Sequence, residues 1–383
     1  MKNIVFVIES LRCGGAEKSL ITLLQKLDYK KHNVDLILTF DRGDFYKLIP
    51  KEVNTFFLDL FEDLPFYEKF LKRSLLYYRK KINFNKKYHP SQLYWKTYNK
   101  PIAFNKHYDV AIAYNQGFAT YYVANNIFSK KKYSWLNTDY KKAGYNIDFD
   151  INSYTHFNKV ICVSEENEAV FRKELIKTNK NIDTLVIKDI TDDLLIKKLS
   201  KESNGLENIE NSIKLLTVGR LAEAKGYNLA IEACRLLIDK GKDVIWYVIG
   251  EGPKRKELEL LIVKHNLQHN FKLLGLKENP YPFIKSCDIY VQTSLFEGLG
   301  LSIIEAAILN KPIVSTNFPA IFSIIENEKT GLICDMNPNA IATTIERYLI
   351  DTELKRRVVK NLSLLTNNDK EVTLKKVNEL LDA

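Results

Sequence analysis

Hydrophobic and polar positions alternate along this chain in two patterns. Short apolar runs are typical of buried strands, and amphipathic stretches are typical of helices. Near the start, residues 4–8 predict a strand and residues 18–27 predict the helix that follows it. Repetition of this alternation predicts an α/β fold with helices packed on parallel sheets. Further strands are predicted at residues 34–40, 55–58, 108–114, 132–136, 213–218, 243–249, 288–294 and 311–316.

The pattern weakens between residues 188 and 213, and residues 200–212 are polar, poor in apolar residues and rich in Asn and Glu towards their end. Such stretches are typical of connectors between domains. A chain of 383 residues also exceeds the usual size of one hydrophobic core. We therefore predict two domains, residues 1–204 and 205–383, each a doubly wound parallel sheet with its ligand site at the carboxyl ends of the strands.

A stretch with two glycines and two acids joins the strand at residues 288–294 to an apolar helical run at residues 301–309. Gly298 and Gly300 lie at this junction, where unpaired N–H groups and the helix dipole favour a phosphate. Glu297 precedes the helix and Glu305 lies inside it. Because carboxylates repel phosphates and accept from hydroxyls, the pair predicts sugar hydroxyls on either side of the phosphates.

Two cations follow the strand at residues 213–218. Arg220 and Lys225 lie in a loop bounded by Gly219 and Gly226. A planar guanidinium and an ammonium at this spacing are suited to gripping a diphosphate. A solvated loop is the alternative.

In the first half, Gly14 and Gly15 precede the helix at residues 18–27. A glycine pair at a helix start lets a ligand approach the backbone closely, although it is equally typical of a plain turn.

These segments resemble a known family. Glu297-Gly-Leu-Gly, followed by Glu305, resembles the paired-glutamate motif of retaining GT-B glycosyltransferases of family 4, also called group 1. The loop from Gly219 to Gly226 is similar to that family's phosphate-binding loop, and the Gly14 loop to its first glycine loop. The likeness covers most of residues 205–350, and residues 1–27 and 108–200 more thinly. Segments around residues 135–140 and 162–166 look like those of capsular and cell-surface polysaccharide enzymes.

The resemblance implies two Rossmann-like domains facing a central cleft, an acceptor-binding domain and then a nucleotide-sugar domain, with the last helix packing back on the first. It implies retaining transfer of a hexose-type sugar from a donor such as a UDP-sugar, without a cofactor or a metal. The implied catalytic residues are Glu297, Arg220, Lys225 and Asn137. The implied donor-binding residues are Gly14, Gly15, Gly250, Gly252, Leu276, Gly298, Leu299, Gly300, Leu301 and Glu305.

Asn137 departs from the family, in which a histidine is expected after Trp-Leu. An amide donates a hydrogen bond to a hydroxyl but carries no proton at neutral pH. Asp139 is the nearest other polar group, and we expect it to be a helix cap.

The net charge of +10 lies in the first half, where residues 1–204 hold 34 Lys and Arg against 24 Asp and Glu. Residues 69–107 contain 11 of these cations, many aromatic residues and no acid. Bases with aromatic residues favour an anionic membrane surface. The alternative is a basic helix that covers the sheet. No signature of a nucleic-acid-binding fold accompanies these residues.

The remaining features exclude several classes. Five scattered cysteines without a Cys-x-x-Cys pair indicate neither a disulfide framework nor a zinc site. Asp148 and Asp150 resemble a metal-binding Asp-x-Asp, but we expect a turn and no metal there. No apolar run is long enough for a membrane helix or a signal peptide, so we expect a cytoplasmic protein attached peripherally to the inner face of the membrane.

Two other functions stay open. A dinucleotide-dependent oxidoreductase shares this architecture, although the Gly-x-Gly-x-x-Gly fingerprint is missing. A non-catalytic partner subunit of the same fold is suggested by Asn137.

Overall fold

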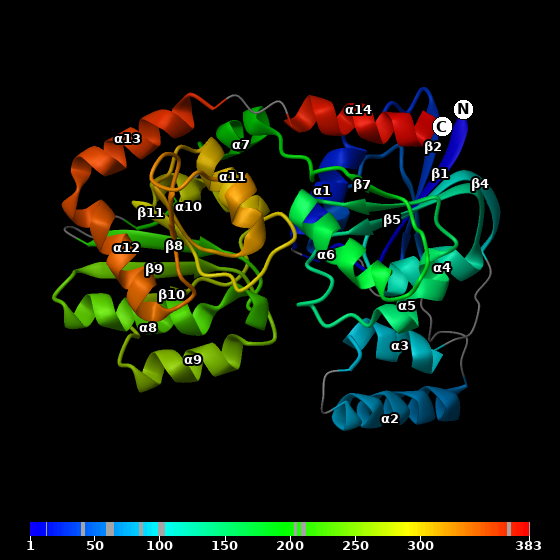
Figure 1. Cartoon of the computed structure of the whole chain (residues 1–383), viewed down its shortest axis with the longest axis horizontal. Coiled ribbons are helices and arrows are strands. Elements are labelled where there is room, and N and C mark those ends of the chain that lie inside the picture. Colours follow the sequence, from blue (N-terminus) through cyan, green and yellow to red (C-terminus); the bar gives the residue numbers. More distant parts are fainter. Residues whose placement is uncertain are drawn as a thin grey trace. The chain divides into compact units, whose positions relative to one another are not determined.

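The structure is a computed structural model of the chain. It describes residues 1–12, 14–39, 43–58, 65–83, 87–98, 104–202, 205–207, 212–365 and 369–382. The chain divides into two compact units, each an α/β structure with helices packed around a sheet (Figure 1). Unit 1 comprises Met1–Ile190 and Glu371–Ala383, and unit 2 comprises Thr191–Lys370.

Unit 1 has a parallel sheet with the strand order β3-β2-β1-β4-β5-β6-β7. The order reverses between β1 and β4, which is typical of doubly wound sheets. β1 is buried on both faces from Ile4 to Ile8, as its continuous apolar run predicts. The strands are β1 (Lys2–Ile8), β2 (His32–Leu38), β3 (Asn54–Phe57), β4 (Phe104–Ala113), β5 (Ile127–Leu136), β6 (Lys159–Cys162) and β7 (Thr184–Val186).

Helices flank this sheet, and α2 packs against α3 on the outside of the unit (Figure 1). Ser164 caps α6, because its hydroxyl accepts from the Asn167 backbone N–H at 3.1 Å. The helices are α1 (Gly15–Leu24), α2 (Phe66–Ile82), α3 (Pro90–Tyr98), α4 (Phe118–Asn126), α5 (Ile147–Tyr154), α6 (Glu165–Ile176) and α14 (Asp369–Asp382), with a 3-10 turn η1 (Asp44–Leu48).

Unit 2 repeats the doubly wound pattern, with the strand order β10-β9-β8-β11-β12-β13. Its strands are β8 (Ile213–Val218), β9 (Val244–Ile249), β10 (Phe271–Leu273), β11 (Ile289–Gln292), β12 (Ile313–Thr316) and β13 (Leu332–Cys334). Its helices are α7 (Asp193–Leu199), α8 (Tyr227–Asp239), α9 (Arg255–Lys264), α10 (Tyr281–Ser286), α11 (Leu301–Ile308), α12 (Pro338–Ile350) and α13 (Thr352–Ser363), with 3-10 turns η2 (Glu223–Lys225) and η3 (Pro319–Ser323).

The first segment of unit 1 ends at Ile190, and unit 2 begins at Thr191. This boundary lies before the one near residue 205 that the polar composition predicts. Helix α7 packs against α10 and α11, and the Asn279 side chain donates to the carbonyl of Leu199 at 2.9 Å. A polar stretch therefore follows the first helix of unit 2 instead of preceding the unit.

The last helix returns to unit 1. In α14, Lys376 Nζ donates to the carbonyl of Val186 at 3.0 Å, and Thr373 donates to that of Lys188 at 3.1 Å. At the other end, Lys2 Nζ donates to the carbonyl of Asp382 at 2.6 Å, which brings the two ends of the chain side by side (Figure 1). Among the described residues, no helix combines the length and the apolar character that crossing a bilayer requires.

Candidate active site

The candidate site of unit 2 lies where its strand order reverses. β8 and β11 are neighbours in the sheet. β9 and β10 follow on the side of β8, and β12 and β13 follow on the side of β11. Open parallel sheets bind ligands at such a reversal, at the carboxyl ends of the strands. Residues 219–226 follow β8, and residues 293–300 follow β11. The two loops touch, because the Leu295 backbone N–H donates to the carbonyl of Ala224 at 2.7 Å.

Gly226 allows this contact between the two loops. Its φ of +59° lies in the left-handed region, and an added Cβ would lie 2.2 Å from the carbonyl oxygen of Thr293. The Thr293 hydroxyl in turn donates to the carbonyl of Lys225 at 2.9 Å. Glycine at this position therefore holds the cation loop against the glutamate loop.

Several side chains of the site donate hydrogen bonds to Glu297. Its carboxylate oxygen Oε1 accepts three hydrogen bonds, and within the described residues Oε2 accepts none. A carboxylate anchored through one oxygen presents the other in a fixed direction to a ligand. The three donors are Lys225 Nζ at 2.5 Å, Ser294 Oγ at 2.6 Å and Gln292 Nε2 at 3.1 Å.

The two neutral donors to Glu297, Gln292 and Ser294, are buried and form further hydrogen bonds. Gln292 Nε2 also donates to Ser294 Oγ at 2.7 Å, and the Tyr290 hydroxyl donates to Gln292 Oε1 at 3.1 Å. This chain runs from β11 into the loop after it. It restricts the Glu297 side chain to one orientation.

The two predicted cations differ in their surroundings. Lys225 is mostly buried and paired with Glu297. Arg220 is exposed, and among the described residues its guanidinium has neither a hydrogen bond nor an ion pair. Lys225 thus neutralises the glutamate and keeps further N–H donors, while Arg220 keeps its whole donor fork for a ligand.

The start of α11 supplies backbone donors. Its N-cap is Gly300, at a φ of +89°, and no side chain caps the helix. Its first turn contains no acid. The first N–H groups of a helix without a side-chain cap, with the positive end of the helix dipole, form a site for an anion.

Glu305 lies deeper than Glu297. It is only 4% exposed, and the Tyr281 hydroxyl of α10 donates to its Oε1 at 3.3 Å. Leu299 is also buried, whereas Leu301 is half-buried. The structure therefore places both predicted glutamates by α11, with Glu297 ahead of the helix and Glu305 within it.

Gly250 and Gly252 lie in the loop after β9, and packing explains both glycines. An added Cβ would lie 2.0 Å from the carbonyl oxygen of Gly219 at Gly250, and 2.4 Å from that of Leu221 at Gly252. The Gly250 N–H donates to the carbonyl of Gly275 at 2.9 Å, next to the half-buried Leu276. These residues bring three strand-end loops together.

Comparisons with known proteins bear on this unit. Residues 200–363 match glycosyl transferases group 1. The unit 2 residues predicted for the site, from Arg220 to Glu305, all lie in this group 1 segment. The family match favours a glycosyltransferase over an oxidoreductase.

Relatives and solved structures extend the likeness. The chain is 32% identical over 174 residues to an uncharacterised glycosyltransferase of Methanocaldococcus jannaschii, covering 44% of this chain and 42% of that one. It is 30% identical over 154 residues to alpha-D-kanosaminyltransferase of Streptomyces kanamyceticus, covering 39% and 40%. The chain thus spans about two fifths of the length of these curated relatives.

Two solved structures cover the whole chain. Anabaena HepE in complex with UDP and glucose has a TM-score of 0.73 and 19% identity, with 100% of both chains covered. Staphylococcus aureus TarM in complex with fondaparinux, alpha-GlcNAc-glycerol and UDP has a TM-score of 0.67 and 15% identity, again with 100% of both covered. These likenesses confirm the predicted α/β fold class, two Rossmann-like domains of the GT-B type.

The predicted site residues of unit 1 lie outside the group 1 segment. Gly14 is the N-cap of α1 with an extended backbone, and Gly15 is its first residue. Asn137 follows β5, and its amide Nδ2 donates to the carbonyl of Tyr114 at 2.7 Å. The amide Nδ2 carries a second N–H, so among the described residues Asn137 keeps one donor as well as its acceptor Oδ1 for a ligand.

Two acids of unit 1 have structural partners. Asp139 accepts from the Lys142 backbone N–H at 2.8 Å, and it caps a turn instead of a helix. Asp148 and Asp150 lie in helix α5, where a turn was expected. Asp150 is buried, and its donors are Tyr121 and Tyr140 at 2.6 Å and Gln92 at 2.7 Å. In the part of the chain that the structure describes, no His, Cys, Asp and Glu residues form a metal-binding group.

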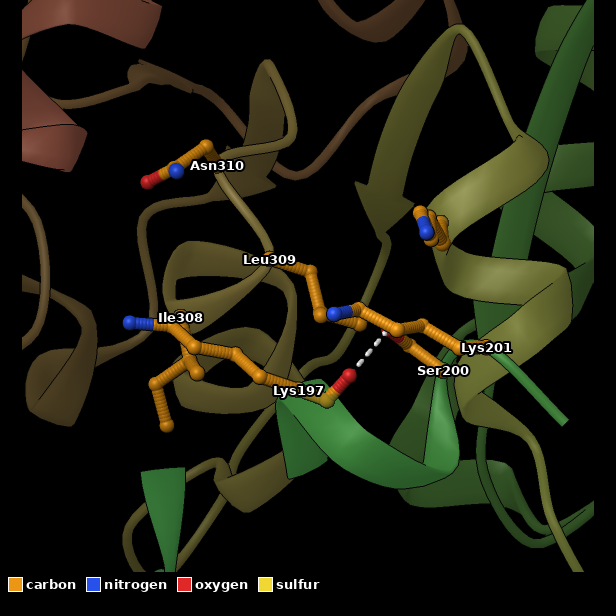
Figure 2. A pocket seen from close by; sticks show the side chains of 7 residues that line it. Lys197, Ser200, Lys201, Ile308, Leu309 and Asn310 are labelled. Atoms are coloured by element: carbon orange, nitrogen blue, oxygen red, sulfur yellow. Dashed lines mark hydrogen bonds between the residues drawn. The ribbon is translucent and has the colours of Figure 1, made fainter. Parts of the chain in front are cut away.

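A shallow hollow of about 270 Å³ lies elsewhere on unit 2, by the C-terminal end of α11 (Figure 2). Lysines from α7, α10 and the turn after α7 line it, together with the end of α11. None of the predicted site residues lines it. The lining residues are Lys197, Ser200, Lys201, Lys285, Ile308, Leu309 and Asn310.

Sequence reasoning missed the residues that orient the glutamates. Gln292, Ser294 and Tyr281 contact Glu297 or Glu305 only because the sheet and its helices bring them there. The spacing of Ser294 and Glu297, three residues apart in a strand-end loop, is the one local signal that could have indicated such a contact.

Proposed function

We propose that this protein is a retaining glycosyltransferase of family 4. It moves a hexose-type sugar from a nucleoside diphosphate sugar, such as a UDP-sugar, to a hydroxyl of a glycan or a lipid-linked glycan in cell-surface polysaccharide synthesis. The observation that carries the proposal is Glu297, anchored through one oxygen beside an uncapped helix start at the sheet reversal. The match of residues 200–363 to glycosyl transferases group 1 supports it.

In the reaction, the bond between the anomeric carbon and the diphosphate oxygen breaks, and a bond from that carbon to the acceptor oxygen forms. The hydroxyl proton leaves with the diphosphate. Negative charge grows on the diphosphate as the first bond breaks. Arg220, Lys225 and the first N–H groups of α11 stabilise this charge, each by a few kcal/mol as preorganised donors do.

The two glutamates orient the sugars of the donor. Glu297 Oε2 accepts from hydroxyls of the transferred sugar, and Glu305 accepts from the ribose. Gly298, Gly300 and the glycine loops at Gly14 and Gly250 let the diphosphate approach the backbone. The base contacts the backbone near Leu276. This arrangement supplies the charge stabilisation from protein groups, so activity should persist in EDTA.

A second part of the proposal concerns helix α2, which would hold the protein on the anionic inner face of a membrane. Its apolar stripe is not packed on the sheet, because Leu71 and Ile82 are 62% and 68% exposed, and none of its side chains is buried. This observation favours the membrane alternative over a helix that covers the sheet. Of the predicted basic segment, residues 84–86 and 99–103 lie outside the described residues.

The direct test is a thermal-shift screen of a panel of nucleotide sugars, followed by donor turnover with each ligand found. A ligand that binds the native state raises the melting temperature. We expect one nucleotide sugar to bind and to be consumed with and without EDTA. Binding without turnover would instead indicate a non-catalytic partner subunit, and stabilisation by a nicotinamide dinucleotide alone would indicate an oxidoreductase.

A further inference from the structure

Three lysines line the shallow hollow by the C-terminal end of α11, which we call the lysine hollow. Lys197 lies in α7, Lys201 lies in the turn after it, and Lys285 lies in α10. Figure 2 shows Lys197 and Lys201 extending past Ile308 and Leu309 at the end of α11. Among the described residues, none of those that line the hollow is acidic. Three positive charges therefore border one volume of about 270 Å³.

The fold does not use the ammonium groups of these three lysines. Within the described ranges, none of them forms a hydrogen bond or an ion pair, so each keeps its N–H donors for a ligand. A fourth lysine lies beside the hollow, because Lys311 Nζ donates to the carbonyl of Lys285 at 2.9 Å. Burial lowers the pKa of Lys311. A bound anion next to these groups would offset the cost of holding like charges together.

The negative end of the α11 dipole does not account for this charge. Backbone N–H groups of residues 309–311 already donate to three carbonyls of the helix end, those of Glu305, Ala306 and Ala307, at 3.2, 3.0 and 2.9 Å. The helix end carries about half a negative charge. Three ammonium groups therefore leave an excess of about two and a half positive charges in the lysine hollow.

The lysine hollow is separate from the proposed diphosphate site. Helix α11 joins the end of β11 to the start of β12, so it runs from the carboxyl edge of the sheet to the amino edge. The proposed diphosphate site lies at the first residues of α11, and the hollow lies at its last residues. The eight residues of the helix separate the two by roughly 12 Å.

The lining of the hollow selects the chemistry of its ligand. A phosphate group carries up to two negative charges and three acceptor oxygens, and it matches three lysines better than a carboxylate with one charge does. Asn310 adds an amide that has no hydrogen bond among the described residues. Ile308 and Leu309 add apolar surface that an inorganic ion would leave uncovered. A ligand with a carbon part attached to its phosphate covers both kinds of surface.

We propose that the lysine hollow binds the phosphate group of an organic phosphate, with the carbon part of the ligand on Ile308 and Leu309. This inference goes beyond the proposed function and does not rest on it. The phosphate belongs either to a soluble phosphate ester or to the head group of a phospholipid, since both present the same group. Leu194, 79% exposed and one turn before Lys197, would contact the acyl chains of a phospholipid.

The test measures the affinity of the full chain for glycerol 3-phosphate, dihexanoyl phosphatidic acid, inorganic phosphate and glycerate by calorimetry. The variant of the hollow is Lys197→Gln with Lys285→Gln. The matched control is Lys256→Gln with Lys264→Gln in α9, which changes the net charge equally. All four lysines are exposed, so both variants should fold like the wild type. Titrations are run with and without saturating UDP, because the proposed diphosphate site also takes phosphates.

We expect the wild type and the control to bind the two organic phosphates alike, and the hollow variant to bind them at least tenfold more weakly, because two of the three charges are removed. A preference of tenfold or more for dihexanoyl phosphatidic acid over glycerol 3-phosphate assigns the hollow to a phospholipid head group. A smaller preference assigns it to a soluble ester.

Equal affinity of the wild type and the hollow variant for both organic phosphates overturns the inference, and so does a wild type that binds neither. Inorganic phosphate or glycerate bound as tightly as the organic phosphates also overturns it. The UDP titrations separate this inference from the proposed function. UDP binding without any effect at the hollow contradicts only the inference, whereas an effect at the hollow without UDP binding contradicts only the proposed donor site.

Discussion

The orientation of Glu297 depends on the residues packed around its carboxylate. Its side chain is held by a charged donor and two neutral donors on a single oxygen. Hydrogen bonds to charged groups each contribute about 1.5 to 3 kcal/mol. Fixing a carboxylate before the substrate arrives also avoids reorganisation during the reaction. Ser294 and Gln292 are therefore positioning residues of the proposed site.

Replacing Ser294 by Ala should lower kcat for sugar transfer about tenfold, because one hydrogen bond to Glu297 Oε1 is lost while the buried loop keeps its shape. Steady-state kinetics with the donor found by the thermal-shift screen measure this. Ser323→Ala, at an exposed serine of η3, is the matched control and should leave kcat unchanged. Equal kcat for the Ser294→Ala variant and the wild type would remove Ser294 from the site.

The proposed phosphate contacts at Arg220 and Lys225 lead to a larger predicted effect. Arg220→Ala or Lys225→Ala should each lower kcat by roughly 10²–10³, the loss found when one preorganised donor to a developing charge is removed. The matched control is Arg235→Ala, at a surface arginine of α8 paired with Asp239. Near-normal turnover by both active-site variants would contradict their role.

Asp150 gives a prediction about stability. Burial raises the pKa of its carboxyl from 3.8 to about 6, although Tyr121, Tyr140 and Gln92 donate to it. Between pH 3.8 and about 6 the Asp150 carboxyl is protonated in the folded state and ionised in the unfolded state. The stabilisation from this group is therefore complete below pH 3.8 and is lost as the pH rises through about 6. Two pKa units correspond to about 3 kcal/mol.

As the pH rises from about 4 to about 7, the wild type should lose about 3 kcal/mol of unfolding free energy through Asp150, and the Asp150→Asn variant should not. The stability difference between the two proteins should therefore shift by this amount in favour of the variant. Urea unfolding of both proteins across this range measures the difference, and contributions of other titrating groups cancel in it. A difference that does not change with pH would show that Asp150 is not proton-linked to folding.

At the scale of elements, the two glycine-bounded loops of unit 2 that the sequence indicated for phosphate binding contact each other in the structure. Gly226 and Gly300 both have left-handed backbones at the ends of the loops selected for phosphate binding. Local sequence patterns did not indicate helix α5, which buries an acid. Helix α5 contains the Asp148-Phe-Asp150 segment that looked like a polar turn, because the sequence does not show the three donors that satisfy Asp150.

Gly226→Ala should be much more destabilising than Gly241→Ala. Both glycines have a positive φ, which costs an alanine about 1 to 2 kcal/mol, but at Gly241 no atom of the described residues lies within 4 Å of an added Cβ. At Gly226 the Cβ would also lie 2.2 Å from a backbone oxygen, which adds roughly 2 kcal/mol or more. Thermal unfolding of the two variants compares them directly. Equal losses would mean that the two site loops do not touch as described.

Helix α2 is predicted to bind anionic vesicles through its apolar stripe. Leu71→Ser with Leu75→Ser should weaken binding at least tenfold, because each leucine contributes about 1.5 kcal/mol or more when it is buried in the interface. Lys80→Gln with Lys81→Gln should weaken it further at low salt. Co-sedimentation with phosphatidylserine vesicles measures both.

The control for α2 is Leu260→Ser, at an exposed leucine of α9 in unit 2. This variant removes the same kind of side chain from a surface that is not proposed to meet a membrane. If it binds as weakly as the α2 variants, or if all variants bind like the wild type, the membrane proposal fails.

At the scale of the whole chain, the alternation of strands and helices was enough to predict two doubly wound units, but not where one ends. The polar residues around 200–212 suggested a linker, yet Gly205 packs so closely that an added Cβ would lie 2.4 Å from the carbonyl of Pro282. Leu206 is buried and donates to Ser286 Oγ at 2.8 Å. Contacts between residues distant in sequence decide a boundary, and composition alone does not show them.

The central claim is that unit 2 binds the diphosphate of a nucleotide sugar between the start of α11 and the Arg220–Lys225 loop. The most direct measurement is a crystal structure of the chain with UDP bound. We expect the diphosphate oxygens within hydrogen-bond distance of the first backbone N–H groups of α11 and of the Arg220 guanidinium. A diphosphate bound away from both of these groups would contradict the account.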